Sequence, residues 1–195
     1  MYVSRGGLKL EAALDAWALD VEGQSCADLG CSTGGFTDCL LQRGADRVYS
    51  VDSGYGVLEW KLRQDPRVTV LERTNAIHFD PGTLDGFTGC DLVVIDLGWT
   101  RQQFAVPAAL RWLRRGARAR IVSLVKPHYE AERAKLRRGV LDDDEASATC
   151  ERTLAALTAI GVNVIQRMPS PIRGGGSRKG GGNVEFLALL QPAGG

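Results

Sequence analysis

The sequence alternates short apolar segments with helical ones, and this alternation constrains the fold more than any other feature. Runs typical of buried strands lie at 25–30, 47–52, 68–72, 91–97, 119–126, 162–168 and 183–191. Segments with helical spacing are expected at 7–19, 35–43, 57–64, 104–115 and 144–160. Such alternation predicts an α/β fold in which a mainly parallel sheet carries helices on both faces.

The end of the chain departs from this pattern. The last two predicted strands, 162–168 and 183–191, have a glycine-rich loop between them and no helix. Strands joined by a loop alone pair naturally in the antiparallel sense. We therefore expect a Rossmann-like, seven-stranded sheet whose last strand is antiparallel.

Composition limits the class of protein. At 195 residues the chain suits one domain, 1–195, and 44% hydrophobic with 24% charged residues is ordinary for a soluble protein. No apolar run is long enough to span a membrane and no signal pattern opens the sequence, so a cytoplasmic location without a membrane partner is expected. Five cysteines without a C-x-x-C pair predict reduced, buried thiols. With only His78 and His128 present, no metal site is expected.

The net charge of +1 hides an uneven distribution. Residues 111–120 carry five arginines and no acid, and acids gather at 142–145. Further basic residues are Arg133, Lys135, Arg137, Arg138, Arg173, Arg178 and Lys179. This separation predicts a local phosphate-binding face, although residues 111–120 fit a merely solvated helix face equally well.

The loop at 28–36 is the strongest candidate for a ligand site. It follows the first predicted strand, and the carboxyl ends of parallel strands are where open α/β sheets bind ligands. The candidate residues are Asp28, Gly30, Ser32, Thr33, Gly34, Gly35 and Phe36. The spacing is G-x-x-x-G-G, not the G-x-G-x-x-G of dinucleotide sites. The leading Asp28 also suits a zwitterionic amino-acid sulfonium better than a pyrophosphate, which seeks donors.

Two further polar residues follow the next predicted strands. Asp52, which ends strand 47–52, is well placed to accept hydrogen bonds from the hydroxyl groups of an adenosine ribose. Asn75 lies just past strand 68–72, and its amide can both donate to and accept from an adenine edge. Together with the glycine-rich loop they predict an adenosyl cofactor.

Several ordered motifs are similar to one known family. They are Val3-Ser4-Arg5-Gly6-Gly7-Leu8-Lys9-Leu10, residues 28–38, Glu72-Arg73-Thr74-Asn75-Ala76, Leu124-Val125-Lys126-Pro127, Ser170-Pro171-Ile172 and Asn183-Val184-Glu185-Phe186-Leu187. With these motifs the chain resembles the haemolysin-A-like (TlyA-type) branch of the FtsJ-like RNA methyltransferases. The resemblance implies a class I methyltransferase fold, S-adenosyl-L-methionine as donor, and a ribose 2′-hydroxyl of ribosomal RNA or ribosomal subunits as acceptor.

The resemblance also implies site residues. The wider family uses a Lys-Asp-Lys-Glu tetrad, and the matching positions are Lys9, Asp96, Lys126 and Glu185. The family's cofactor contacts carry over to Gly34, Phe36, Asp52, Asn75 and Asp96.

The residues themselves support three of the four tetrad positions. Asp96 and Lys126 end adjacent central strands, where ionisable groups are costly unless they have a role or a partner. Glu185 interrupts an otherwise apolar predicted strand. Lys9, on the N-terminal helix within residues 1–20, would be unremarkable without the resemblance.

The chemistry requires a positioned acceptor that loses its proton, since a sulfonium methyl needs no activation. Lys126 serves either as a general base or as a cation that stabilises the developing alkoxide. Lys9 and desolvation favour the neutral amine, whereas Asp96 and Glu185 favour the ammonium, so both roles stay open. We interpret Lys126 as nearest the proton and oriented by Asp96, with Lys9 and Glu185 orienting the acceptor ribose.

Three departures from the family pattern bear on the acceptor. Members of this branch usually carry an N-terminal RNA-binding S4 module. This sequence starts just after the point where that module would end. We therefore expect either that a longer chain was shortened or that RNA is held by other means. The usual Val-Ser-aromatic after the tetrad aspartate is replaced by Leu97-Gly98-Trp99-Thr100, in which Trp99 either stacks on a base or packs. The loop 173–182 is unusually long and glycine-rich, which fits a basic lid or a disordered segment.

Other functions fit the sequence less well than methyl transfer to RNA. A catalytically weak or inactive module that binds an adenosyl group or RNA is the main alternative, because the residues after Asp96 are altered and the S4 module is missing from this sequence. A membrane-active haemolysin lacks an apolar or amphipathic segment to support it. A nicotinamide dehydrogenase is disfavoured by the spacing of the glycines.

Overall fold

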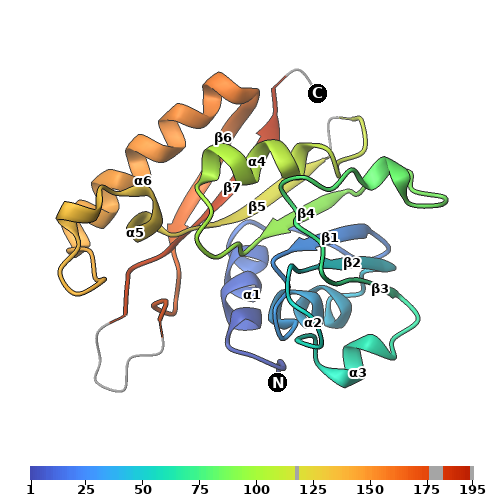
Figure 1. Cartoon of the computed structure of the whole chain (residues 1–195). Helices are drawn as coiled ribbons and strands as arrows, with labels where there is room; N and C mark the ends of the chain where they lie inside the picture. Colours follow the sequence, from blue (N-terminus) through green and yellow to red (C-terminus); the bar gives the residue numbers. More distant parts are fainter. Residues whose placement is uncertain (117–118, 176–181, 194–195) are drawn as a thin grey trace.

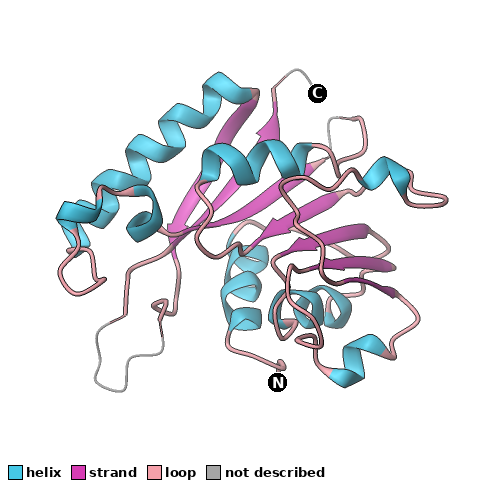
Figure 2. Cartoon of the chain, viewed as in Figure 1, coloured by secondary structure: helices cyan, strands magenta, loops and turns pink. Residues whose placement is uncertain are grey.

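The computed structural model describes residues 1–116, 119–175 and 182–193. One seven-stranded sheet runs through the molecule, in the order β3-β2-β1-β4-β5-β7-β6 (Figures 1 and 2). Its strands are β1 (Ser25–Leu29), β2 (Arg47–Val51), β3 (Val68–Leu71), β4 (Leu92–Ile95), β5 (Arg120–Val125), β6 (Val162–Pro169) and β7 (Phe186–Pro192). Strands β1 to β5 pair in parallel, and β7 is antiparallel to both of its neighbours, β5 and β6. The predicted sheet, with its antiparallel last strand, is confirmed.

Helices cover both faces of the sheet (Figure 2). They are α1 (Gly6–Ala16), α2 (Gly35–Gln42), α3 (Trp60–Arg63), α4 (Gln102–Leu110), α5 (Pro127–Glu130) and α6 (Asp143–Leu157), with short 3₁₀ turns η1 (Pro81–Thr83), η2 (Arg133–Lys135) and η3 (Thr158–Ile160). Helices α1, α2 and α3 pack into one apolar core, and α4 and α6 pack into the other. Within β4, Leu92 and Val94 join the first core and Val93 and Ile95 the second, as the two-residue alternation of strand side chains requires.

Several predicted boundaries are wrong. Of the helix expected at 57–64, only the four residues of α3 are helical. The backbone amides of Gly56 and Val57 donate to the Glu72 carboxylate and not to carbonyl oxygens of a helix. Helix α1 ends at Ala16, three residues before its predicted end at 19. Ala18, which lies two residues further on, has a φ of 49°. Helices α4 and α6 also end before 115 and 160. Helix α5 was not predicted at all.

The last strand begins later than expected. The sequence places a strand at 183–191, but β7 starts at Phe186. Asn183 instead forms an isolated bridge with Gly174, and the carbonyl oxygen of Glu185 accepts a hydrogen bond from the Ser170 amide at 2.8 Å. Glu185 therefore lies just before the strand and does not interrupt it.

Candidate active site

Two adjoining cavities open at the carboxyl ends of β1, β4 and β5. One of about 230 Å³ is lined by the N-terminal segment, the loop after β1 and residues near Gly174. The other, of about 480 Å³, is lined by residues that follow β2, β3, β4 and β5. Gly30, Ser32 and Asp96 line both, so the two spaces meet at the first glycine of the predicted loop. The predicted position of the site at this edge of the sheet agrees with these cavities.

The loop after β1 requires glycine at particular positions. Gly30 has a φ of 93°, and a Cβ atom there would lie 2.6 Å from the Asp96 carbonyl oxygen. Gly34 has a φ of 98° and is the N-cap of α2, which begins at Gly35. A Cβ atom on Gly35 would lie 2.3 Å from the Ser4 hydroxyl. The glycines therefore permit both the turn and the close approach of β4 and of the N-terminal segment.

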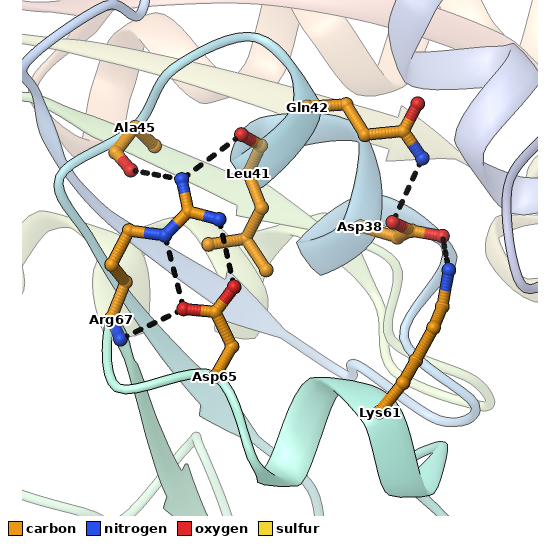
Figure 3. A network of polar contacts seen from close by, with 7 residues as sticks. All are labelled: Asp38, Leu41, Gln42, Ala45, Lys61, Asp65 and Arg67. Atoms are coloured by element: carbon orange, nitrogen blue, oxygen red, sulfur yellow. Dashed lines mark hydrogen bonds and ion pairs between the residues drawn. The ribbon is translucent and has the colours of Figure 1, made fainter.

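The N-terminal segment is fastened over this loop by Asp38 on α2. The buried carboxylate accepts hydrogen bonds from the Val3 amide at 2.8 Å, from Gln42 at 2.9 Å and from Lys61 at 3.2 Å. Figure 3 shows Asp38 between the last two. Burial raises the pKa of Asp38, but these hydrogen bonds outweigh it and hold the pKa below its usual value. As a result, residues 4–6 form a wall of the smaller cavity.

The same part of the fold is braced at the outer edge of the sheet. Arg67, next to β3, pairs with Asp65 at 2.7 Å and donates to the carbonyl oxygens of Leu41 and Ala45 (Figure 3). This contact fixes the carboxyl end of α2, whose amino end carries the glycine loop.

Asp28 is a fully buried carboxyl group in the wall of the smaller cavity. Its Oδ2 accepts hydrogen bonds from the amide and the hydroxyl of Thr37 at 2.9 and 2.7 Å. Its Oδ1 is buried and has no hydrogen-bond partner among the described residues. Burial raises the pKa of Asp28 to about 7, although the Thr37 hydrogen bonds lower it. A buried, unpartnered oxygen of this kind fits a cationic ligand group.

Asp52 and Asn75 line the larger cavity, each with part of its side chain already bound to backbone. The Asp52 carboxylate accepts from the amides of Ser32 at 2.8 Å and Gly54 at 2.7 Å. Each carboxylate oxygen keeps a second lone pair for a ligand hydroxyl. The Asn75 carbonyl oxygen accepts from the Ile77 amide at 2.9 Å, which leaves its NH₂ group as the donor toward a ligand.

The remaining residues of the predicted loop have different surroundings. Ser32 lies between the two cavities at a φ of 49°. Thr33 lines the smaller cavity, and its carbonyl oxygen accepts from the Glu59 amide at 3.1 Å. Phe36 is buried at the start of α2 and joins the core beneath the cavity.

Asp96 and Lys126 form an ion pair between the ends of adjacent strands. The Lys126 Nζ lies 2.5 Å from Asp96 Oδ1, and it also donates to the Leu97 carbonyl oxygen at 3.3 Å. Both side chains are mostly shielded from solvent, with 14% and 26% of their surfaces exposed. Both line the larger cavity, and Asp96 lines the smaller one as well. A cation and a carboxylate thus stand where the two spaces meet.

Lys9 and Glu185 form a second, more deeply buried ion pair. The Lys9 Nζ on α1 lies 2.5 Å from Glu185 Oε2, and only 11% and 4% of these side chains are exposed. Gly174 covers Glu185 so closely that a Cβ atom there would lie 1.8 Å from Oε1. Lys9 and Gly174 both line the smaller cavity, so the predicted tetrad comes together as two ion pairs around connected spaces.

Aromatic residues flank Lys126 on the open side. Trp99 has 88% of its surface exposed, and its ring lies 4.9 Å from that of Tyr129 on α5. The Lys126 ammonium lies 5.8 Å from the centre of the Tyr129 ring. Burial and the Lys126 charge lower the pKa of the neighbouring His128 to about 4, so its imidazole is neutral at pH 7. Because most of its surface is exposed, Trp99 does not pack into the core.

Sequence reasoning missed Tyr129 and Gly174. The only available signals were their positions, three residues after Lys126 and within the glycine-rich stretch. The places of Tyr129 and Gly174 in the site depend on contacts with residues far away in the sequence.

Two exposed arginines of the basic segment at 111–120 are engaged in contacts within the protein. Arg111 donates to the carbonyl oxygens of Ala76, Ile77 and Phe79, and Arg114 pairs with Asp91 at 3.0 Å. Arg118 lies outside the described residues, as do Arg178, Lys179 and most of the loop 173–182. The prediction of a phosphate-binding face at 111–120 therefore gains no support.

Other predictions concern absences. Among the described residues no helix is long and apolar enough to cross a membrane, and no three His, Cys, Asp or Glu side chains are grouped to hold a metal ion. All five cysteines lie in the described ranges, where they are buried and free, as predicted.

Comparison with known families gives a match over nearly the whole chain. The model of the FtsJ-like methyltransferases matches residues 2–187. Among curated proteins, YqxC of Bacillus subtilis, assigned as an rRNA methyltransferase, is 40% identical over 97% of this chain. The 16S/23S rRNA (cytidine-2′-O)-methyltransferase TlyA of Mycobacterium tuberculosis is 41% identical, also over 97%. The chain spans only 65% of the length of YqxC and 68% of TlyA.

Solved structures agree with these matches. A Streptococcus thermophilus protein assigned as a hemolysin is 40% identical with a TM-score of 0.89, over 99% of this chain and 68% of that one. An S-adenosylmethionine-dependent methyltransferase of Mesorhizobium loti has a TM-score of 0.63 at 16% identity, over 92% and 95%. The second likeness concerns the fold alone.

Proposed function

The chain belongs to the FtsJ-like methyltransferase family, and from this premise we propose that it transfers the methyl group of S-adenosyl-L-methionine to a ribose 2′-hydroxyl of ribosomal RNA. One observation carries the proposal: Asp96, at the junction of the two cavities, holds Lys126 at 2.5 Å. A charge pair at this point can serve a methyl donor on one side and an acceptor hydroxyl on the other. The names of the curated relatives support this substrate class.

The proposed cofactor site uses both cavities. Asp52 and the Asn75 amide would hold the adenosine in the larger one. Gly30, Gly34 and Gly35 would let the backbone approach the methionine part, and Asp28 Oδ1 would face its positive charge. The bound sulfonium supplies the methyl group itself, so these residues orient the donor and need not activate it.

The proposed acceptor site is centred on Lys126. Two of the three ammonium donors are used by Asp96 and the Leu97 carbonyl oxygen, so the side chain is held in one place with one position left for a substrate oxygen. To accept the proton of the 2′-hydroxyl, Lys126 must first lose one of its own protons to solvent. The neutral amine then keeps two N–H donors for Asp96 and the Leu97 carbonyl oxygen and offers its lone pair to the hydroxyl, with Asp96 setting its orientation. Lys9 and Glu185 would orient the ribose, and Trp99 would stack on the target base.

Tritium transfer from labelled S-adenosylmethionine to ribosomal RNA or ribosomal subunits tests the proposal. Label is expected on a ribose 2′-oxygen, and Lys126→Ala is expected to abolish it while cofactor binding persists. Label on a base would overturn the assigned chemistry. Cofactor binding without transfer to any ribosomal substrate would instead identify a binding module. We also propose that residues 1–195 form one functional domain, and the experiment therefore uses the whole chain.

A further inference from the structure

The connection between α5 and α6 carries a concentration of positive charge that the proposed chemistry does not use. Residues 131–141, called here the basic loop, contain four basic residues and one acid. Arg133, Lys135, Arg137 and Arg138 are all exposed. No motif in this loop was needed for the cofactor or for the tetrad.

The nearby acids do not neutralise three of these four cations. Asp142 caps α6 by accepting from the Asp144 amide at 3.0 Å. Asp143 pairs with Arg173 at 2.5 Å. Glu145 is taken by Lys135 at 2.8 Å and by Arg152 at 2.7 Å.

The other three cations of the basic loop remain available. Within the part of the chain that the structure describes, the guanidinium groups of Arg133, Arg137 and Arg138 form no hydrogen bond or ion pair. Unpaired arginines on one exposed loop attract a polyanion, since each can neutralise one phosphate.

The basic loop is tied to the acceptor side of the candidate site. The Asn183 side chain accepts from the Leu141 amide at 2.9 Å and donates to the Gly139 carbonyl oxygen at 3.0 Å. Asn183 is two residues from Glu185, a distance of about 7 Å along an extended chain. In Figure 1 this connection lies beside the segment that leads to β7. Arg138 directly precedes Gly139, so it belongs to the part of the loop that Asn183 holds.

At its other end the basic loop continues directly from the aromatic pair. Tyr129, whose ring centre lies 4.9 Å from that of Trp99, is on α5 only four residues before Arg133. The unpaired arginines thus follow Tyr129 within four to nine residues along the chain. A strand whose base reaches Trp99 would have its neighbouring phosphates over this loop.

We propose that the basic loop is an RNA-backbone binding surface, in which Arg133, Arg137 and Arg138 contact phosphates of the strand next to the target nucleotide and Asn183 holds the loop in place. This inference rests on the proposed function, because it assumes an RNA acceptor at Lys126. The contacts are to phosphates, so they position the strand and do not read its sequence.

Salt dependence of RNA binding tests the surface. The triple variant Arg133→Gln, Arg137→Gln, Arg138→Gln is compared with the unaltered chain by fluorescence anisotropy on a single-stranded fragment of ribosomal RNA. Each lost phosphate contact should reduce the slope of log affinity against log salt by about 0.7, so three should reduce it by about two. S-adenosylmethionine affinity and the thermal unfolding temperature should stay unchanged.

The single variant Arg115→Gln is the matched control. Arg115 is also an exposed arginine, but it follows α4 and precedes β5. It therefore lies near the amino end of β5, whereas the cavities lie at the carboxyl ends of the strands. It should leave the slope unchanged. A triple variant with the slope of the unaltered chain would overturn the proposal. So would a triple variant that binds RNA as the unaltered chain does and loses only binding to phosphatidylglycerol vesicles. Methyl transfer is a separate readout: its absence in the unaltered chain would contradict the proposed function, whereas the slope still tests the loop.

Discussion

The Nζ of Lys126 lies 2.5 Å from Oδ1 of Asp96, across the carboxyl ends of the neighbouring strands β4 and β5. Neither residue is near the other in sequence, and each directly follows its strand. The pair therefore depends on the adjacency of β4 and β5. Among the described residues, it fixes the one lysine that lines the larger cavity.

Replacing Lys126 should remove methyl transfer while leaving cofactor binding intact. General-base catalysis contributes roughly 10²–10⁴-fold, so Lys126→Ala should lower kcat by at least about 100-fold. Lys126→Arg should be equally inactive, since arginine keeps the charge but does not give up its proton at neutral pH. Both are measured by tritium transfer, with cofactor affinity by calorimetry. Substantial activity in the arginine variant would show that Lys126 acts as a cation and not as a base.

Breaking the Lys9–Glu185 pair should destabilise the fold. Removing one partner of a buried pair leaves an uncompensated charge and costs about 3–5 kcal/mol. Lys9→Met should therefore lower the free energy of unfolding by about 3 kcal/mol in urea. The double variant with Glu185→Leu should recover part of this loss, because it removes the stranded carboxylate. Equal stability of the single variant and the unaltered chain would contradict the burial of the pair.

Gly174 should not tolerate a side chain. A Cβ atom at this position would lie 1.8 Å from Glu185 Oε1, so Gly174→Ala must displace Glu185 from Lys9. We expect a loss of about 1–3 kcal/mol of stability and a lower kcat. Gly98→Ala is the stability control, since its Cβ would meet nothing within 4 Å. If both variants unfold at the same denaturant concentration, the close contact is not required.

Asp28 should make stability and cofactor affinity depend on pH. Its pKa is about 7 in the folded chain and 3.8 in its ordinary state, so the folded chain holds more protons between these values. The free energy of unfolding should therefore fall as pH rises from about 4 to 7. Affinity for the cationic S-adenosylmethionine should rise over pH 6–8, as the carboxylate forms. Asp28→Asn should flatten both dependences, measured by urea unfolding and calorimetry. An unchanged pH profile in that variant would rule out Asp28 as the titrating group.

Trp99 should contribute to RNA binding and not to cofactor binding. Stacking of one base on an aromatic ring is worth about 1–3 kcal/mol, so Trp99→Ala should weaken RNA affinity roughly tenfold. The KM for RNA should rise accordingly in the transfer assay. Trp60→Ala is the control, since Trp60 is also exposed, at 69%, but lies on α3. Equal effects of the two variants would mean that exposed tryptophans act nonspecifically.

Local patterns predicted much of the fold. Short apolar runs between helical segments located all seven strands, and the loop connection of the last two predicted their antiparallel pairing. The predicted boundaries failed where a tertiary hydrogen bond replaced a local one, as at Val57 and at Glu185. The insertion of β7 between β5 and β6 also lies beyond local pattern, since strand order depends on contacts between segments far apart in the sequence.

By itself, the sequence determined the glycine loop after β1, the polar residues Asp52, Asn75 and Asp96 after the next three strands, and the lysine after β5. These follow from chain geometry, because parallel strands bring their carboxyl ends to one edge of the sheet. Only the tertiary structure decided which charges pair. Lys9 and Glu185 are separated by 176 positions and meet because α1 packs beside the residues that lead into β7. The same holds for Gly174, Tyr129 and the unpaired arginines of the basic loop: their partners, or lack of them, depend on long-range packing that no local period encodes.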